Sequence, residues 1–477
     1  MLLIFHFFPS STSRVSLLQS GTHYTINQTT DTMFSVSFIP SQEGSSDETP
    51  LPYTASPLRL LASDIILVFH HLGSVLWLFS PLWPCKSGAL DETYPSRKNL
   101  WCGVVHVVLV IAQLLFLVSL VVCVLCLVPA LWVLVYGVGV VGMNYWVCNR
   151  ALNGTERVLR SAVGVDGEEE HGRECWVYVN GVAAGEHWMQ QHLDRLAYTF
   201  GRRIIGIHNR TLGIVFDIIE CLIQRCFSYA TQDVREAYAI IKEALVNPEI
   251  DKVILILHSQ GGIEGGLIID WLLDEMPQDL LCHLEVYTFG NAANHFNNPF
   301  RRVLDFRSTK CKRADLIHSQ HTAEQDGKSI CHIEHYVNSK DFVGLWGVMN
   351  FINVPNRYMG RLFVRSGPGH LLNQHYMDSM FPLGPDMKAS ETNEFMETEL
   401  DMANTASAAG VDGSNEKVDT PGERSSVQVT PNASGPVPSD NHGNPVSDRP
   451  LKVKDLSRLW LYRNGGLPPC QEEYKQA

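Results

Sequence analysis

The sequence predicts an α/β fold in which helices cover both faces of a mostly parallel sheet, preceded by a hairpin of two membrane helices. Residues 103–147 contain no Asp, Glu, Lys or Arg, which predicts the membrane helices. From residue 175 onward, short apolar segments typical of buried strands alternate with segments of helical periodicity. The chain has 477 residues, enough for one large domain with appendages.

Charge and cysteine content narrow the partners and the compartment. The net charge of -13 disfavours nucleic acid as a partner, because phosphates require a basic surface. The 12 cysteines show no regular spacing, which favours reduced thiols facing the cytosol over a disulfide framework.

The N-terminal part divides into two regions. Residues 1–57 are rich in Ser, Thr and Pro, and we expect them to be disordered. Residues 58–100 are more apolar, and within them 65–83 is an apolar and aromatic stretch. This stretch either lies at a membrane interface, with Trp77 and Trp83 at the depth of the headgroups, or is an ordinary packed helix.

Residues 101–148 are predicted to form the two membrane helices. One span needs about 20 apolar residues, so the run has room for two, with Pro129 at the turn between them. Basic residues flank the run on both sides: Arg97, Lys98, Arg150, Arg157 and Arg160. Positive charge at both ends predicts that both ends, and the following domain, face the cytosol. The hairpin either crosses the bilayer or dips into one leaflet, and the alternative is a buried helix pair in a soluble protein.

Residues 175–383 are predicted to form the α/β domain. Strands are expected at 176–179, 203–208, 252–257, 284–289, 332–337 and 361–364. Helices are expected at 186–200, 213–226, 233–245 and 263–275. Residues 384–450 have few large apolar side chains and are expected to be disordered, whereas the segment 451–477 either docks on the domain or binds a partner.

Ser259 is the candidate nucleophile. It follows the apolar strand 252–257 and precedes Gly261, Gly262 and a helical segment. A sharp turn from strand to helix holds a serine hydroxyl clear of the sheet, where a base can reach it, and is typical of the α/β-hydrolase fold. The N–H of Gln260 would then face the developing oxyanion. Leu257 stands where this motif usually has its first glycine, and the alternative is a turn whose serine only caps the helix.

The acid and the base are expected downstream in the order Ser, acid, His. Asp341 follows the strand 332–337 and would orient the histidine; the alternative is a turn residue or helix cap. His370 lies in a glycine-rich loop after the strand 361–364 and is the preferred base, while His375 is the alternative.

A second oxyanion donor is expected after the first strand of the domain. The N–H of Gly181 or Val182 could supply it, although Asn-Gly is also common in simple turns. A group of Cys and His residues lacks the spacing of a zinc site, so we expect no metal and no cofactor. Its members are Cys311, His318, His321, Cys331, His332 and His335.

Four segments together resemble the fungal membrane-associated α/β-hydrolase proteins related to the class 3 lipases. They are Val177–Val182, His258–Gly262, Tyr287–Ala292 and Tyr336–Asp341. The resemblance covers about residues 175–383 and includes the Thr-Phe-Gly of residues 288–290 and the Val-Asn-x-x-Asp of residues 337–341. It implies a serine hydrolase that cleaves acyl esters, with lipid and membrane as partners. The rival is a non-catalytic anchored protein that uses the same scaffold for binding. A channel is disfavoured because the spans carry no charged side chain.

Overall fold

The computed structural model describes residues 35–42, 56–82, 86–164, 171–300, 328–401 and 450–468. The protein is a mixed α/β structure built on one nine-stranded sheet in the order β2-β4-β3-β5-β6-β7-β8-β1-β9. Its parallel centre consists of β4 (Ile204–Ile207), β3 (Glu174–Val179), β5 (Lys252–His258), β6 (Leu284–Phe289), β7 (His332–Asn338) and β8 (Arg361–Arg365). All six predicted strands and the mostly parallel sheet are therefore confirmed.

The two edges of the sheet contain strands that the sequence did not predict. β2 (Val158–Arg160) pairs antiparallel with β4 at one edge. At the other edge, β1 (Val36–Ile39) pairs antiparallel with β8, and β9 (Leu400–Asp401) pairs with β1. The prediction that residues 1–57 are disordered is wrong for β1, because Val36 and Phe38 are buried against the sheet.

Helices cover both faces of the sheet. α4 (Glu186–Phe200) packs on the face that carries Trp176 and Tyr178. α6 (Gln232–Val246) and α7 (Gly261–Glu275) pack on the face that carries Val177 and Val179. Successive residues of a strand point to opposite faces, so a strand buried on both sides has a continuous apolar run, as β5 has from Val253 to Leu257.

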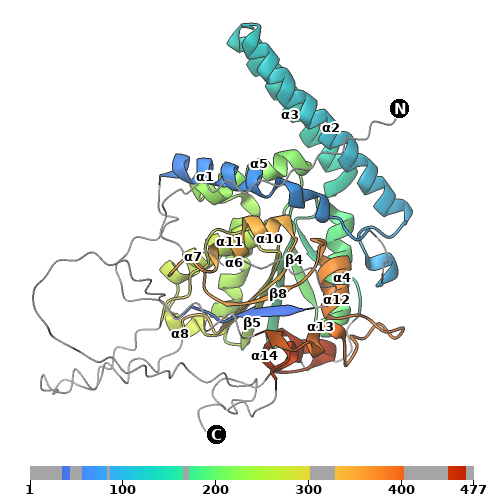
Figure 1. Cartoon of the computed structure of the whole chain (residues 1–477), viewed down its shortest axis with the longest axis vertical. Helices are drawn as coiled ribbons and strands as arrows, with labels where there is room; N and C mark the ends of the chain where they lie inside the picture. The colour runs from blue at the N-terminus through green and yellow to red at the C-terminus, as the bar shows by residue number, and fades with distance from the viewer. Residues whose placement is uncertain are drawn as a thin grey trace, which may run out of the picture.

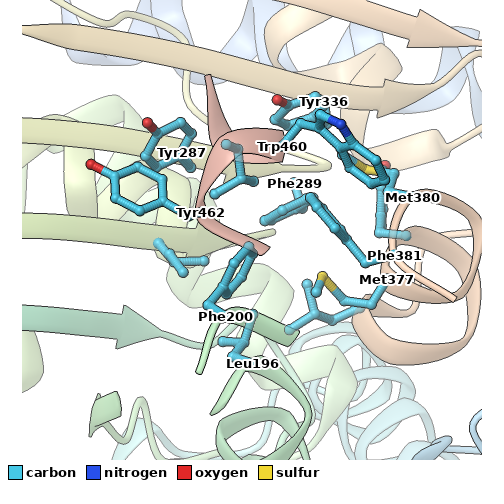
Figure 2. Packing of buried hydrophobic residues seen from close by; sticks show 14 of the residues in the cluster. Leu196, Phe200, Tyr287, Phe289, Tyr336, Met377, Met380, Phe381, Trp460 and Tyr462 are labelled. Carbon is cyan, nitrogen blue, oxygen red and sulfur yellow. The ribbon is translucent and has the colours of Figure 1, made fainter. Parts of the chain in front are cut away.

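The described part of the C-terminal segment, residues 450–468, docks on the domain, as the first of the two alternatives predicts. η7 (Leu459–Gly465) places Trp460 and Tyr462 among the aromatic side chains of the core (Figure 2). The Arg458 guanidinium binds Glu285 at 3.0 Å, with both groups buried. The nearby α13 (Glu394–Glu397) buries Phe395 and Met396, so the prediction of disorder over 384–450 is wrong for residues 384–401.

α2 (Arg97–Leu125) and α3 (Ala130–Cys148) form a hairpin that extends well beyond the domain (Figure 1). Pro129 lies in the turn between them, as predicted. Both helices are long and apolar enough to cross a membrane. Most of their apolar side chains are exposed, whereas a soluble helix pair would bury them. One face of the N-terminal part of α2, from Asn99 to Phe116, packs against the domain.

α1 (Pro57–His70) and α5 (Ile214–Phe227) lie side by side on the part of the domain nearest the hairpin (Figure 1). The remaining elements are short: η2 (Leu72–Trp77), η3 (Gly88–Leu90), η4 (Asn149–Asn153), α8 (Gln278–Leu281), α10 (Phe342–Trp346), α11 (Val348–Phe351), η5 (Leu372–Met377), α12 (Asp378–Met380) and α14 (Val453–Leu456).

Candidate active site

Ser259 lies on a tight turn between β5 and α7. Its φ is +58°, a conformation that L-residues rarely adopt and that is found at strained turns carrying nucleophiles. The turn requires close packing, because a Cβ at Gly261 would lie 2.5 Å from the Val179 carbonyl oxygen. Gly265 of α7 leaves room for Leu257, whose Cδ1 would lie 2.1 Å from a Cβ at that position. The large residue at the first position of the motif is thus accommodated by a glycine on the facing helix.

Ser259, His370 and Asp341 form one hydrogen-bonded chain. His370 Nε2 lies 2.9 Å from Ser259 Oγ, and His370 Nδ1 lies 2.7 Å from Asp341 Oδ2. All three side chains are buried. In the tautomer that this chain requires, Nδ1–H donates to Asp341, and Nε2 is free to accept the serine proton.

Asp341 holds this position through further hydrogen bonds. Its Oδ1 accepts from the Val343 N–H at 2.9 Å and so caps α10, while its Oδ2 also accepts from the Tyr376 hydroxyl at 2.6 Å. Asp341 therefore caps α10 and binds His370 at the same time, although the sequence indicated these two roles as alternatives. Tyr376 was not predicted, because nothing in its local sequence links it to residue 341.

His375, the alternative base, has no contact with Ser259. Its Nδ1 accepts from the Leu371 N–H at 3.0 Å, and its Nε2 donates to the Pro81 carbonyl at 3.0 Å. Both ring nitrogens are occupied, so His375 fixes the loop that carries His370.

A second buried histidine, His258, contacts the candidate base His370 through its ring and through a hydrogen bond. Its ring stacks on His370 at a centroid distance of 4.8 Å, and its Nε2 donates to the His370 carbonyl at 2.8 Å. Burial, followed by the neighbouring charge of His370, holds the pKa of His258 well below its ordinary value. His258 therefore stays neutral and does not compete with a positive charge that develops on His370.

Gly290, at the end of β6, makes room for the acid and the base. Its φ is +53°, and a Cβ there would lie 2.7 Å from Asp341 Oδ2 and 2.9 Å from His370 Nδ1.

For the ester hydrolase that the sequence predicts, replacing Gly290 by alanine is expected to lower kcat about 100-fold, the usual result of displacing a catalytic group by about 1 Å. The matched control is Gly88→Ala, because Gly88 has a similar φ of +61° and nothing within 4 Å of its added Cβ. Steady-state kinetics would compare the two variants. Equal activities would show that the space at Gly290 is not needed.

Two backbone donors lie close to the candidate nucleophile. Gln260 follows Ser259 directly, and a Cβ at Gly181 would lie only 2.9 Å from Ser259 Oγ. Within the described part of the chain, the N–H groups of Gln260, Gly181 and Val182 have no hydrogen-bond acceptor, which leaves all three available to an oxyanion. The alternative donor at Gly181 lies in the same loop as Val182, and its lack of a side chain keeps the space beside Ser259 open.

Asp217 of α5 fixes the loop that carries these donors. It accepts from the Ala183 N–H at 3.0 Å, the Leu212 N–H at 2.7 Å and the Thr211 hydroxyl at 2.6 Å. Burial raises the pKa of Asp217 to about 6.

The hairpin binds the same region through two polar side chains. Gln113 of α2 and Asn144 of α3 both donate to the Leu212 carbonyl, at 2.6 and 2.7 Å. Gln113 also donates to Asn144 at 2.9 Å and accepts from the Val215 N–H at 3.2 Å. These bonds join the hairpin to the domain. Both residues stand in the apolar run of the sequence, but their partners could not be predicted from it.

A buried acidic group supports η5, which follows His370. Glu92 accepts from the N–H groups of Asn373 and Gln374 at 2.9 and 3.1 Å.

The residue before it, Asp91, is also buried and lies near the carboxylate of Asp378. Burial, and then the charge of Asp378, raise the pKa of Asp91 to about 8.

Stability is therefore expected to fall as the pH rises towards 9. The folded state binds the Asp91 proton more tightly than the unfolded state, so this contribution is complete below pH about 4 and is lost as the pH rises through about 8. Between these values the free energy of unfolding should fall by up to about 1.4 kcal/mol per pH unit, and less in Asp91→Asn. Urea unfolding in detergent at pH 6 and pH 9 would measure this, with the exposed Asp274→Asn as control. Identical pH dependence in all three proteins would exclude Asp91 as the cause.

The Cys and His residues around position 320 form no metal site among the described residues. His335 binds Thr288 at 2.7 Å and the Met359 carbonyl at 2.9 Å, and His332 binds Glu334 at 2.7 Å. Cys311, His318 and His321 lie outside the described residues.

Comparison with known proteins gives no match: neither a protein-family model nor a curated protein is similar to this chain. The class of protein must therefore be argued from the fold and the site. These define a Ser-His-Asp group on a mostly parallel α/β sheet, attached to a hairpin of two apolar helices.

Proposed function

We propose that this chain is a membrane-anchored serine hydrolase of the α/β-hydrolase fold that cleaves acyl esters of lipids. The observation that carries the proposal is the hydrogen-bonded chain from Ser259 through His370 to Asp341, at 2.9 and 2.7 Å. The strained turn after β5 and the chain order Ser, Asp, His support the fold assignment.

In this mechanism Ser259 Oγ attacks the ester carbonyl while His370 Nε2 takes its proton. Asp341 holds the imidazole in the correct tautomer and stabilises its charged form. The N–H groups of Gln260 and of Gly181 or Val182 stabilise the oxyanion, and His370 then returns the proton to the leaving alcohol. A water molecule, activated by His370, hydrolyses the acyl-enzyme in the second half of the reaction.

The hairpin supports a lipid as the substrate, because it would hold the domain beside a bilayer. The basic residues that flank it support a domain facing the cytosol. All described cysteines are free, which is consistent with that compartment. The resemblance of four segments to relatives of the class 3 lipases also favours acyl esters, and we propose neither a cofactor nor a nucleic-acid partner.

The rival function is a non-catalytic anchor protein that uses this scaffold for binding. A fluorophosphonate probe separates the two, since it reacts with activated serines. We expect labelling of the full chain in detergent and its loss in Ser259→Ala. No labelling of the wild-type chain would favour the rival.

The substrate class is tested with esters of graded acyl length. A lipid hydrolase should prefer long acyl chains presented in micelles or vesicles over short soluble esters. A preference for short thioesters would assign the same site to an anchored thioesterase.

A further inference from the structure

α1 and α5 have an inverted distribution of polar and apolar side chains. The one buried residue of α1 is Asp64, and the buried residues of α5 include Asp217 and Arg225. Eight large apolar side chains of these helices point outward, namely Leu58, Ile65, Ile66 and Phe69 on α1 and Ile218, Ile219, Ile223 and Phe227 on α5, whereas Leu67, Val68 and Leu222 pack against the core. A helix on a water-facing surface places its apolar side inward, so this arrangement indicates an apolar environment outside the protein.

The buried charges of Asp64 and Arg225 are paired within the protein. Arg225 binds Asp64 at 2.8 Å, which ties α5 to α1, and also donates to the Ala292 carbonyl at 2.8 Å. Arg59, in the first turn of α1, is the only exposed charged residue on either helix. A single long basic side chain at the end of a helix can reach the headgroups of a bilayer.

The same apolar surface continues through the segment between α1 and η3. Leu72, Leu76 and Trp77 of η2 are exposed, as are Phe79 and Leu82. We call the outward apolar residues of α1, of this segment and of α5 the α1–α5 face. Trp83 lies outside the described residues.

The α1–α5 face borders the hairpin. Phe116 of α2 contacts Phe216 of α5 edge-on, with ring centroids 6.1 Å apart. The bonds from Gln113 and Asn144 to residues 212–215 fix the angle between the hairpin and α5. Insertion of the hairpin therefore also determines where the α1–α5 face lies, and in Figure 1 it lies on the part of the domain from which the hairpin extends.

The face also borders the candidate active site. The carbonyl oxygens of Trp77 and Leu78 accept from the N–H groups of Gly369 and His370, at 3.1 and 2.9 Å. The loop that carries the candidate base thus lies directly against the apolar segment.

We propose that the α1–α5 face docks on the lipid bilayer, so that the hairpin inserts while α1, η2 and α5 rest in the interface and the His370 loop lies beside lipid. The docking does not depend on catalysis. Its consequence, entry of the ester from the bilayer, rests on the proposed function.

The test is depth-dependent quenching in phosphatidylcholine vesicles whose acyl chains carry bromine. A genetically encoded fluorescent amino acid replaces Ile66, Ile219, Val121 of the hairpin, or Val246 of α6, one at a time in the full chain. Val246 is the control, since it is also apolar and exposed. We expect loss of emission at Ile66, Ile219 and Val121 but not at Val246. Quenching at Val121 alone would show that the α1–α5 face remains in water. A blue shift of the emission at Ile66 and Ile219 without quenching would show that protein covers the face. Either result overturns the proposal, and so does the absence of quenching at Val121.

Activity provides the second measurement. The double variant Ile66→Ser with Ile219→Ser should cleave a vesicle-borne ester at least about tenfold more slowly, the factor that corresponds to losing the burial of one isoleucine. Cleavage of a soluble short-chain ester should not change, and Val246→Ser should behave as the wild type. An unchanged rate on vesicles contradicts bilayer access. If no ester is cleaved by any variant, the proposed function fails, while the quenching result still decides the docking.

Discussion

Ser259→Ala is expected to lower kcat for ester hydrolysis by about 10⁶-fold, the loss seen when the nucleophile of a serine hydrolase is removed. The variant retains the fold, because the Ser259 backbone, and not its hydroxyl, bonds to the Phe289 carbonyl at 3.0 Å. Alanine at φ +58° carries the same backbone strain as serine, so stability should change little.

Hydrolysis of a chromogenic long-chain ester by the purified full chain would measure this effect. Ser228→Ala is the matched control, because Ser228 also has a positive φ of +52° and lies at the end of α5. A kcat of Ser259→Ala within about tenfold of the wild-type value would exclude this serine as the nucleophile.

The central strands were predictable because burial on both faces makes their sequences continuously apolar. β5 is the clearest case, with every residue from Val253 to His258 buried. The turn at Ser259 followed from the glycines after it. That Leu257 fits beside this turn could not be predicted, because the space for it is left by Gly265 on α7, and only the packed structure brings the two residues together.

The edge strands and the docked C-terminal segment could not be predicted from composition. β1 and β9 are short, and their polar neighbours dominate any average over the sequence. Trp460 and Tyr462 enter the core through contacts with residues far away in the sequence, such as Phe381 and Tyr287 (Figure 2). Local pattern carries no information on such contacts.

In the candidate site, too, some features could be predicted from the sequence and others required the structure. The order of Ser259, Asp341 and His370 was predictable because each follows a strand whose end lies at the same edge of the sheet. The choice between His370 and His375 depended on the path of the loop, which Pro81 and Leu371 determine. The supporting contacts from His258, Tyr376 and Gln113 each join distant segments and required the structure.

Asp341→Asn is expected to lower kcat by about 10⁴-fold without unfolding the protein, as the same change does in Ser-His-Asp hydrolases. The side-chain amide of the introduced asparagine would face His370 Nδ1 as a donor, and the imidazole would then carry its proton on Nε2 and could not accept one from Ser259. The cap of α10 should survive, because asparagine is as good an N-cap as aspartate and its oxygen can still accept from the Val343 N–H.

Tyr376→Phe provides the comparison, since it removes one hydrogen bond to the same carboxylate, at 2.6 Å, without changing the charge. Its kcat should fall by roughly tenfold, which corresponds to one charged hydrogen bond. The pH–rate profile discriminates further: the loss in Asp341→Asn should shrink at high pH, where hydroxide can replace the missing base. If Asp341→Asn and Tyr376→Phe are equally active, Asp341 serves only as the cap of α10, and the imidazole of His370 must be oriented by its contacts with His258.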